Sequence, residues 1–312
     1  MTKKKTLLLI NPVGTDRTGF SQDRTSKFPP LALGIVAAMT PEHFRIKILD
    51  ENFQRARFRN ADLVGITAYT ENAPRAYEIA ALFRSRGVPV VMGGIHASAC
   101  PEEAARFVDA VVVGEAEAVW PKVIDDFEKG QLQTFYKAQG YIPAEKIPQA
   151  RHELFHPLYH FRIVQTTRGC PYDCEFCTVT AFNGRVYRER PVDDVLDELQ
   201  KHLAPYRSVI FADDNLVGKN QKQRDRAIAL FKGIVERGIK ISWFSQVTVD
   251  IADDEEVLHW AAKSGCKILL VGIEAETDQG LQYLNKTLNR RKGGIDYYRK
   301  AFRTINHHGN TI

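Results

Sequence analysis

Short apolar runs alternate with amphipathic segments along the first 130 residues of the chain. The runs are rich in Val, Ile or Leu, end at Gly, Pro or polar residues, and lie at residues 6–10, 45–49, 63–67, 89–92 and 110–113. Between the third and fourth runs, residues 74–86 repeat apolar side chains at helical spacing, from Ala76 to Phe83. Buried parallel strands joined by helices show this alternation, so it predicts a doubly wound α/β domain over residues 1–130.

A second alternation begins at residue 161, after a stretch without a clear period. Residues 131–160 carry Pro143, Pro148 and Pro157, and we interpret them as a linker. Beyond the linker, strands are expected at residues 161–167, 208–213, 241–248 and 267–273, and helices at residues 192–203, 223–237, 254–264 and 294–307. Strand–helix repeats that keep one sense predict a (β/α) barrel, whose chemistry sits on loops after the carboxyl ends of the strands.

The expected barrel is incomplete over residues 161–312. Only four strand–helix units precede residues 310–312, which look like the opening of a fifth strand. An open barrel edge would be exposed and prone to aggregation. We therefore expect either that something else covers this edge or that the sequence is a truncated fragment of a longer protein, and we favour the fragment.

Composition narrows the class of protein. Apolar residues make up 44% of the chain and charged residues 26%, as in soluble globular proteins. The net charge of +5 is spread along the chain, so a nucleic-acid partner is not expected. The first apolar run, residues 6–10, is too short for the apolar region of a signal peptide, and no run reaches the roughly 18 residues of a transmembrane segment. These features predict a cytoplasmic protein.

Three of the five cysteines, Cys170, Cys174 and Cys177, fall within eight residues after the first strand of the second alternation. Their spacing is C-x3-C-x2-C. Three thiolates on one loop can bind three irons of a [4Fe–4S] cluster, and the missing fourth thiolate leaves one iron open to an exogenous ligand. A structural zinc site is the alternative, but it needs a fourth Cys or His at close spacing, and His160 and His202 are not so placed.

The segment GCPYDCEFC at residues 169–177 resembles the cluster motif of the radical S-adenosylmethionine (SAM) superfamily, with Phe176 in its aromatic position. The resemblance implies that the three cysteines are the metal-binding and catalytic residues. It further implies that the open iron binds the amino and carboxylate groups of SAM, and that an electron from the reduced cluster cleaves SAM to a 5′-deoxyadenosyl radical. An electron donor such as flavodoxin or ferredoxin is then required.

Segments at the later strands are similar to SAM-binding segments of the same superfamily. Residues 211–215 read FADDN, Ser245 and Gln246 lie in the third strand, and residues 271–274 read VGIE. The resemblance implies SAM contacts from Phe176, Asp213, Asp214, Asn215, Ser245, Gln246 and Glu274. Barrel geometry is an independent reason, because the carboxyl ends of parallel strands meet at the rim that carries the cluster loop. For the adjacent carboxylates, a solvated turn or a helix cap is the alternative.

The first domain resembles the Rossmann-like cobalamin-binding domain that precedes the barrel in part of this superfamily. The resemblance is carried by FPPLALG at residues 28–34, GITAYT at 65–70, GGIH at 93–96 and GEAE at 114–117. The last three follow parallel strands, at the edge where open α/β sheets bind ligands. The cobalamin contacts that it implies are Thr67, Tyr69, Thr70, Gly93, Gly94, His96, Glu115 and Glu117. An ordinary flavodoxin-like domain with a Gly-Gly turn is the alternative.

One departure from the family pattern concerns the cobalt ligand. Many cobalamin domains carry D-x-H-x-x-G, whose histidine is the lower ligand of cobalt, whereas this chain reads DEN at residues 50–52. We therefore expect a displaced nucleotide tail and no cobalt ligand from that motif. His96 is the nearest candidate for the corrin region, although a lone loop histidine is more often a polar contact. Cys100 and Cys266 have no partner and are expected to be small buried residues.

The resemblance implies a cobalamin-dependent radical SAM enzyme, with methylation of an unactivated carbon as its leading reaction. In such enzymes one SAM remethylates cobalt, a second generates the radical that takes hydrogen from the substrate, and the substrate radical then collects the methyl group. A radical cyclase or rearrangement enzyme, with or without cobalamin, stays open, as does a non-catalytic iron–sulfur or zinc protein. The substrate is expected to be a small or lipid-like molecule, and lipid, tetrapyrrole, peptide and antibiotic precursors fit equally.

Overall fold

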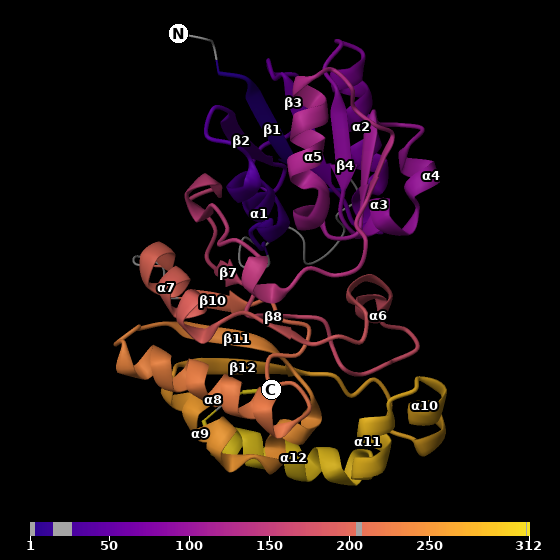
Figure 1. The fold of residues 1–312 in the computed structure, drawn as a ribbon. Helices are drawn as coiled ribbons and strands as arrows, with labels where there is room; N and C mark the ends of the chain where they lie inside the picture. Colours follow the sequence, from indigo (N-terminus) through magenta and orange to yellow (C-terminus); the bar gives the residue numbers. More distant parts are fainter. Residues whose placement is uncertain (1–3, 15–26, 204–207, 310) are drawn as a thin grey trace. The chain divides into compact units, whose positions relative to one another are not determined.

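The computed structural model describes residues 4–14, 27–203, 208–309 and 311–312. The chain divides into two compact units, Met1–His160 and Phe161–Ile312, and each unit is built around its own parallel sheet (Figure 1). The second unit begins at the residue where the second alternation starts, whereas residues 131–160 belong to the first unit. In the described part of the chain, no helix combines the length and the apolar character needed to cross a membrane.

The sheet of the first unit has six parallel strands in the order β2-β1-β3-β4-β5-β6. The strands are β1 (Thr6–Asn11), β2 (Arg45–Asp50), β3 (Leu63–Thr67), β4 (Val90–Gly93), β5 (Ala110–Val113) and β6 (Phe135–Lys137). The first five are the strands that the sequence predicts. The strand order reverses between β1 and β3, and open α/β sheets bind ligands beyond the carboxyl ends of their strands at such a switch point.

Helices cover both faces of this sheet, which confirms the doubly wound fold. Helices α1 (Leu31–Met39) and α5 (Ala116–Glu128) pack on one face. Helices α2 (Ala73–Arg84), α3 (Ile95–Ala99) and α4 (Pro101–Ala104) pack on the other, and a 3-10 turn, η3 (Thr70–Asn72), precedes α2. Leu7 and Leu9 of β1 face the first layer, and Leu8 and Ile10 face the second. A strand buried on both faces reads as a continuous apolar run for this reason.

Residues 131–160, interpreted from the sequence as a linker, are folded onto the first unit. They contain β6 and two 3-10 turns, η4 (Ala144–Lys146) and η5 (His152–Leu154). Phe155 and Tyr159 join a buried cluster with Ile35 of α1. Gly34 leaves room for this cluster, because a Cβ there would lie 2.5 Å from Cζ of Phe155. The apolar residues of the segment do not recur at strand or helix spacing, so the sequence pattern did not predict these elements.

The sheet of the second unit has four parallel strands in the order β12-β11-β10-β7. They are β7 (Arg162–Val164), β10 (Ser208–Phe211), β11 (Ser242–Val247) and β12 (Cys266–Val271). The predicted first strand is divided, because β8 (Thr167–Arg168) leaves the sheet and pairs antiparallel with β9 (Arg188–Glu189). Thr311 forms a parallel bridge with Ile268 at the position of the expected fifth strand, and Asn310 lies outside the described residues.

Four helices of the second unit lie where the sequence predicts them. They are α7 (Val192–Leu203), α8 (Gln221–Glu236), α9 (Glu255–Lys263) and α12 (Ile295–His307). They share one apolar core with the sheet, in which the ring of Trp243 lies 5.1 Å from the ring of Phe211 and 5.1 Å from that of Phe231. The short elements α6 (Thr178–Asn183), α10 (Asp278–Tyr283), α11 (Thr287–Lys292) and the 3-10 turn η6 (Val249–Asp253) were not predicted.

Candidate functional site

The cluster loop, residues 169–177, joins β8 to α6 and carries the three predicted cysteines. Gly169 opens the loop with a φ of +88°, and a Cβ at this position would lie 2.0 Å from the carbonyl oxygen of Val186. Only glycine therefore lets the loop pass this close to the segment before β9. The N–H of Cys177 donates to the carbonyl oxygen of Cys174 at 3.0 Å, which closes a tight turn. All three thiols of the loop are free and partly exposed.

The thiols of the cluster loop lie near enough to act on one another electrostatically. The pKa of Cys170 is raised to about 11, mainly by burial and further by the nearby charges of Asp214, Cys174 and Cys177. Thiolates that repel one another in this way are stabilised together by a bound metal centre, so the loop fits an iron–sulfur cluster. Among the described residues, no three Cys, His, Asp or Glu side chains are grouped to hold a single metal ion.

Asp213 braces the chain beneath the cluster loop. Its carboxylate accepts hydrogen bonds from the N–H and the hydroxyl of Thr166, both at 2.6 Å, and from the N–H of Thr167 at 2.9 Å. The residue is only 1% exposed, and burial raises its pKa, although these hydrogen bonds and the charge of Arg226 act against the rise. Because the carboxylate takes the N–H groups that a longer β7 would use, β7 stops at Val164.

Asp214, the next residue, holds the cluster loop itself. Its carboxylate accepts a hydrogen bond from the N–H of Gly169 at 2.8 Å and another from Nδ2 of Asn183 at 3.1 Å. The first bond fixes the start of the loop, and the second fixes α6, which follows it. Burial raises the pKa of Asp214, and both hydrogen bonds lower it. The two adjacent carboxylates after β10 therefore anchor the loop that follows β7.

Asn215 is the predicted SAM contact with a free hydrogen-bonding group. Its side chain is buried, and neither amide atom has a hydrogen-bond partner among the described residues. An unsatisfied buried amide costs about 1–3 kcal/mol, so the position fits a ligand that would satisfy it. Ser245 is also buried, but its hydroxyl already donates to the carbonyl oxygen of Phe211 at 2.8 Å. Gln246 is exposed at the end of β11, and its carbonyl oxygen accepts the N–H of Leu216.

Glu274 and Phe176 are the remaining predicted SAM contacts. Glu274 follows β12 with a φ of +52°, which is uncommon for a residue other than glycine, and its carboxylate pairs with Lys286 at 2.5 Å. Phe176 lies in the cluster loop with half of its surface exposed. Phe176 is thus part of the cluster loop, and Glu274 is linked to it through Lys286, the residue after Asn285, whose side chain binds the carbonyl oxygen of Asp173.

In the first unit, the predicted cobalamin contacts lie after neighbouring strands at one edge of the sheet. Thr67 ends β3, Gly93 ends β4, and Glu115 and Glu117 lie at the start of α5. Gly94 has a φ of +95°, and a Cβ there would lie 2.7 Å from Oγ1 of Thr67. Glycine at this place keeps the backbone accessible between two strand ends, as the approach of a large flat ligand requires.

Several of these side chains already have protein partners. His96 is 4% exposed, with Nε2 2.8 Å from the hydroxyl of Tyr77 and Nδ1 3.3 Å from that of Thr70. Both ring nitrogens are thus engaged, which favours a polar contact over a cobalt ligand for this histidine. Glu115 is buried and accepts the N–H of Ile142 at 2.8 Å. Tyr69, in contrast, is 60% exposed.

The place of the missing D-x-H-x-x-G motif holds buried carboxylates. Glu51 accepts hydrogen bonds from Arg75 at 2.7 Å, from Val13 and from Ala56. Although burial raises the pKa of Glu51, these hydrogen bonds hold it below its ordinary value. Asp50 accepts hydrogen bonds from Asn11 and Tyr159. The carboxylates of this place are thus engaged with protein donors.

Comparison with known protein families identifies the two domains of the chain. The model of the B12 binding domain matches residues 21–124, and the model of the radical SAM superfamily matches residues 164–311. The chain belongs to the cobalamin-binding radical SAM family. Residues Met1–His160 thus contain its B12-binding domain, and residues Phe161–Ile312 contain its radical SAM domain. The predicted fold class and the predicted cofactor-binding domains are confirmed.

Curated relatives resemble most of this two-domain chain, and solved structures resemble nearly all of its fold. Bacteriochlorophyllide d C-8(2)-methyltransferase of Chlorobaculum tepidum is 31% identical over 82% of this chain and 60% of its own length. Hopanoid C-2 methylase of Rhodopseudomonas palustris is 26% identical over 86% of this chain and 52% of its own length. The radical enzyme OxsB, solved with aqua-cobalamin and S-adenosylmethionine, has a TM-score of 0.78 and 17% identity over 98% of this chain and 48% of its own, a likeness of fold. The chain thus spans about half to three-fifths of the length of these proteins.

The radical SAM domain contains two further residues that the sequence did not single out. Asn285 donates a hydrogen bond from Nδ2 to the carbonyl oxygen of Asp173 in the cluster loop, and Lys286 lowers the pKa of Cys174, which burial raises. One signal was available: Asn285 follows a short helix and has a φ of +52°, a conformation that asparagine adopts more readily than most residues.

Cys100, Cys266 and Arg190 lie outside the cluster loop. Cys266 is buried in the core of the radical SAM domain, as expected. Cys100 is only partly buried, contrary to expectation, because it lies at the junction of the short helices α3 and α4 rather than in a core. Arg190, which follows the cluster loop, pairs with Glu198 at 2.7 Å and with Asp194.

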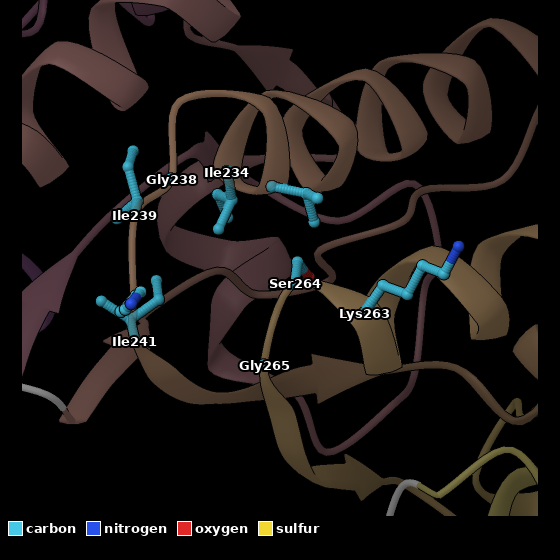
Figure 2. A pocket seen from close by; sticks show the side chains of 9 residues that line it. Ile234, Gly238, Ile239, Ile241, Lys263, Ser264 and Gly265 are labelled. Carbon is cyan, nitrogen blue, oxygen red and sulfur yellow. The ribbon is translucent and has the colours of Figure 1, made fainter.

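A pocket of about 270 Å³ lies at the amino ends of β11 and β12 (Figure 2). Its lining comes from the end of α8, the segment before β11 and the end of α9, and includes Ile234, Ile239, Ile241 and Lys263. The strands are parallel, so their amino ends are opposite the carboxyl ends that carry Asp214, Gln246 and Glu274. The pocket is therefore separate from the candidate site.

Proposed function

We propose that this protein is a cobalamin-dependent radical SAM methyltransferase that adds a methyl group to an unactivated carbon. The observation that carries the proposal is the cluster loop, where three partly exposed thiols act on one another in a radical SAM domain that follows a B12-binding domain. The names of the relatives, a methyltransferase and a methylase, support the reaction class.

In this proposal Cys170, Cys174 and Cys177 hold the [4Fe–4S] cluster as thiolates, and each thiol releases its proton on binding. Asp213 and Ser245 are braces, because the core already satisfies their polar groups. The proposed SAM contacts are the side chains at the rim of the sheet, Phe176, Asp214, Asn215, Gln246 and Glu274. Asn215 has the strongest support, because its buried amide has no partner among the described residues.

For the B12-binding domain, we propose contacts from the edge formed by the ends of β3, β4 and β5. Gly93 and Gly94 allow close approach to the backbone, and Tyr69 offers an exposed aromatic face. Thr67, Thr70 and Glu117 border the same edge, whereas His96 and Glu115 support it from within. When the cofactors are bound, SAM at the cluster would supply a hydrogen-abstracting radical, and cobalamin would supply a transferable methyl group.

The proposed substrate is a small or lipid-like molecule. The two relatives are named for bacteriochlorophyllide and for hopanoids, which supports this class. We further propose an electron donor of the flavodoxin or ferredoxin kind, since the cluster must be reduced before SAM is cleaved. Free thiols that bind a reduced cluster require a reducing compartment, which makes the cytoplasm the proposed location.

Anaerobic reconstitution with iron and sulfide tests the cluster assignment. We expect about four irons per chain and formation of 5′-deoxyadenosine from SAM once dithionite is added. Cys174→Ala should abolish 5′-deoxyadenosine formation, because it removes one of three thiolate ligands. Cys100→Ala is the matched control, since this partly exposed cysteine lies in the other domain, and it should leave the iron content unchanged.

Two results would contradict the proposal. A wild-type chain that takes up zinc but no iron would favour a structural metal protein. Methylation itself is tested by incubating the cobalamin-loaded protein with methyl-labelled SAM, which should place the label on cobalamin. Formation of 5′-deoxyadenosine without any label on cobalamin would favour a radical cyclase or rearrangement enzyme.

A further inference from the structure

Residues 284–286, here called the clasp, hold the cluster loop on both sides of Cys174. The N–H of Glu175 donates to the carbonyl oxygen of Leu284 at 3.1 Å. On the other side, Nδ2 of Asn285 donates to the carbonyl oxygen of Asp173 at 2.5 Å. Cys174 is the residue between these two anchored positions, so the clasp fixes the backbone of one cluster ligand.

The side chain of Lys286 extends from the clasp to the end of β12. Its Nζ lies 2.5 Å from Oε2 of Glu274 and donates to the carbonyl oxygen of Gly272 at 3.2 Å. Lys286 is only 9% exposed, whereas the carboxylate of Glu274 is open to solvent. Asn289 donates to the same carbonyl oxygen of Gly272 at 3.0 Å, which holds the turn from a second side.

The backbone at the end of β12 is shaped around this ion pair. A Cβ at Gly272 would lie 2.7 Å from Oε1 of Glu274 and 3.2 Å from Nζ of Lys286. Glu274 itself has a φ of +52°, a conformation that is strained for a residue with a side chain. Such a conformation persists only where surrounding contacts hold it. The ion pair with Lys286 is one of the contacts that hold Glu274.

The pair lies beside the segment that carries Cys174. Lys286 directly follows Asn285, whose side chain binds the carbonyl oxygen of Asp173, and Glu274 is paired with Lys286. The two charges of the pair have opposite signs. The pair of Lys232 and Glu256, in contrast, joins α8 to α9 with both side chains at least one-third exposed.

We propose that the Lys286–Glu274 pair sets the reduction potential of the cluster bound at Cys174, with the clasp fixing the position of the pair. This inference rests on the proposed function, which supplies the cluster. Reduction adds one negative charge to the cluster, so a nearby cation favours the reduced form and a nearby carboxylate favours the oxidised form. Lys286 is thus a positioning residue. Its positive charge stabilises the reduced cluster, and its ion pair holds the carboxylate of Glu274 in place.

An anaerobic redox titration followed by electron paramagnetic resonance tests the inference on the reconstituted full chain, without SAM or substrate. Lys286→Met removes the cation and leaves the carboxylate, so the potential should shift to more negative values. Glu274→Gln removes the carboxylate and leaves the cation, so the potential should shift to more positive values. Lys286→Arg keeps the charge and should restore the wild-type potential.

Matched variants separate electrostatics from structure. Lys232→Met removes a lysine from an exposed ion pair of the same domain and should leave the potential unchanged. Asn285→Gly permits the positive φ but removes the hydrogen bond to Asp173, and it should reduce iron per chain more than it shifts the potential. If Lys286→Met fails to bind iron, Lys286→Arg and Glu274→Gln decide the question by the same titration.

The failures of this inference and of the proposed function are distinguishable. Iron-loaded protein in which Lys286→Met and Glu274→Gln shift the potential in the same direction, or not at all, would overturn the inference alone. A wild-type chain that takes up no iron would overturn the proposed function and the inference with it.

Discussion

Asp213 and Asp214 are adjacent carboxylates that contribute unequally to the stability of the fold. Asp213 is buried, accepts three hydrogen bonds and lies near the charge of the half-buried Arg226. Asp214 is less buried and accepts two hydrogen bonds at the start of the cluster loop and from α6. Removal of a buried charge also leaves its partners unpaired, and this is the larger cost at such sites.

Asp213→Ala should therefore lower the free energy of unfolding by about 3–5 kcal/mol, because it leaves three donors without their acceptor and removes the carboxylate that lies near the charge of Arg226. Asp214→Ala should cost about 1–2 kcal/mol and mainly reduce iron uptake. Urea unfolding of the metal-free chain and iron analysis after reconstitution measure the two effects. Equal losses of stability in the two variants would contradict this ranking.

Glu51 makes the B12-binding domain sensitive to acid. The pKa of this buried carboxyl lies below its ordinary value of 4.5, so its stabilisation is present above pH 4.5 and is lost as the pH falls through the lowered value. Glu51→Gln should lower the melting temperature at pH 7, and the difference from wild type should shrink below about pH 4.5. Glu102→Gln, at an exposed position of α4, is the control and should change neither.

Whether a site residue can be predicted from the sequence depends on how far along the chain its partners lie. The three cysteines were predictable because their spacing lies within one loop. The bond between Asn285 and Asp173 joins residues 112 positions apart, so no local pattern announces it. Lys286 likewise reads as an ordinary surface lysine until the fold brings it beside Glu274.

Among the elements, the long periodic helices and the buried strands were predictable, because their core-facing residues repeat at fixed intervals. The short elements β6, α6, α10 and α11 were not, since each has at most six residues and shows hardly two turns of a period. The early end of β7 was also hidden, because a side chain on another strand, Asp213, causes it.

The arm formed by β8 and β9 depends on one glycine. Gly169→Ala would place a methyl group 2.0 Å from the carbonyl oxygen of Val186 at a φ of +88°, so the cluster loop must move. We expect loss of iron binding and a decrease of about 1–3 kcal/mol in the free energy of unfolding. Gly238→Ala, at a φ of +64° with open space around it, is the control and should keep the iron content of the wild type. Iron analysis and urea unfolding of both variants provide the measurement, and normal iron in Gly169→Ala would refute the argument.

Across the whole chain, the two cofactor sites belong to separate sheets with separate cores. Loss of one cofactor should therefore spare the other. Cys174→Ala should lose iron yet keep the corrin absorption of protein loaded with cobalamin. Gly94→Ala, whose methyl group would lie 2.7 Å from Oγ1 of Thr67, should do the reverse, whereas Gly87→Ala, with open space around it, should affect neither. Simultaneous loss of both cofactors in either variant would contradict this independence.

The brace from Asp213 to Thr166 also sets the order of assembly. These residues are 47 positions apart, and their contact exists only after β10 has paired with β7. We therefore expect the sheet to hold the cysteine ligands before the cluster binds, unlike a zinc finger, whose metal drives its folding. Far-ultraviolet circular dichroism of the metal-free chain, unchanged by reconstitution, is the expected result.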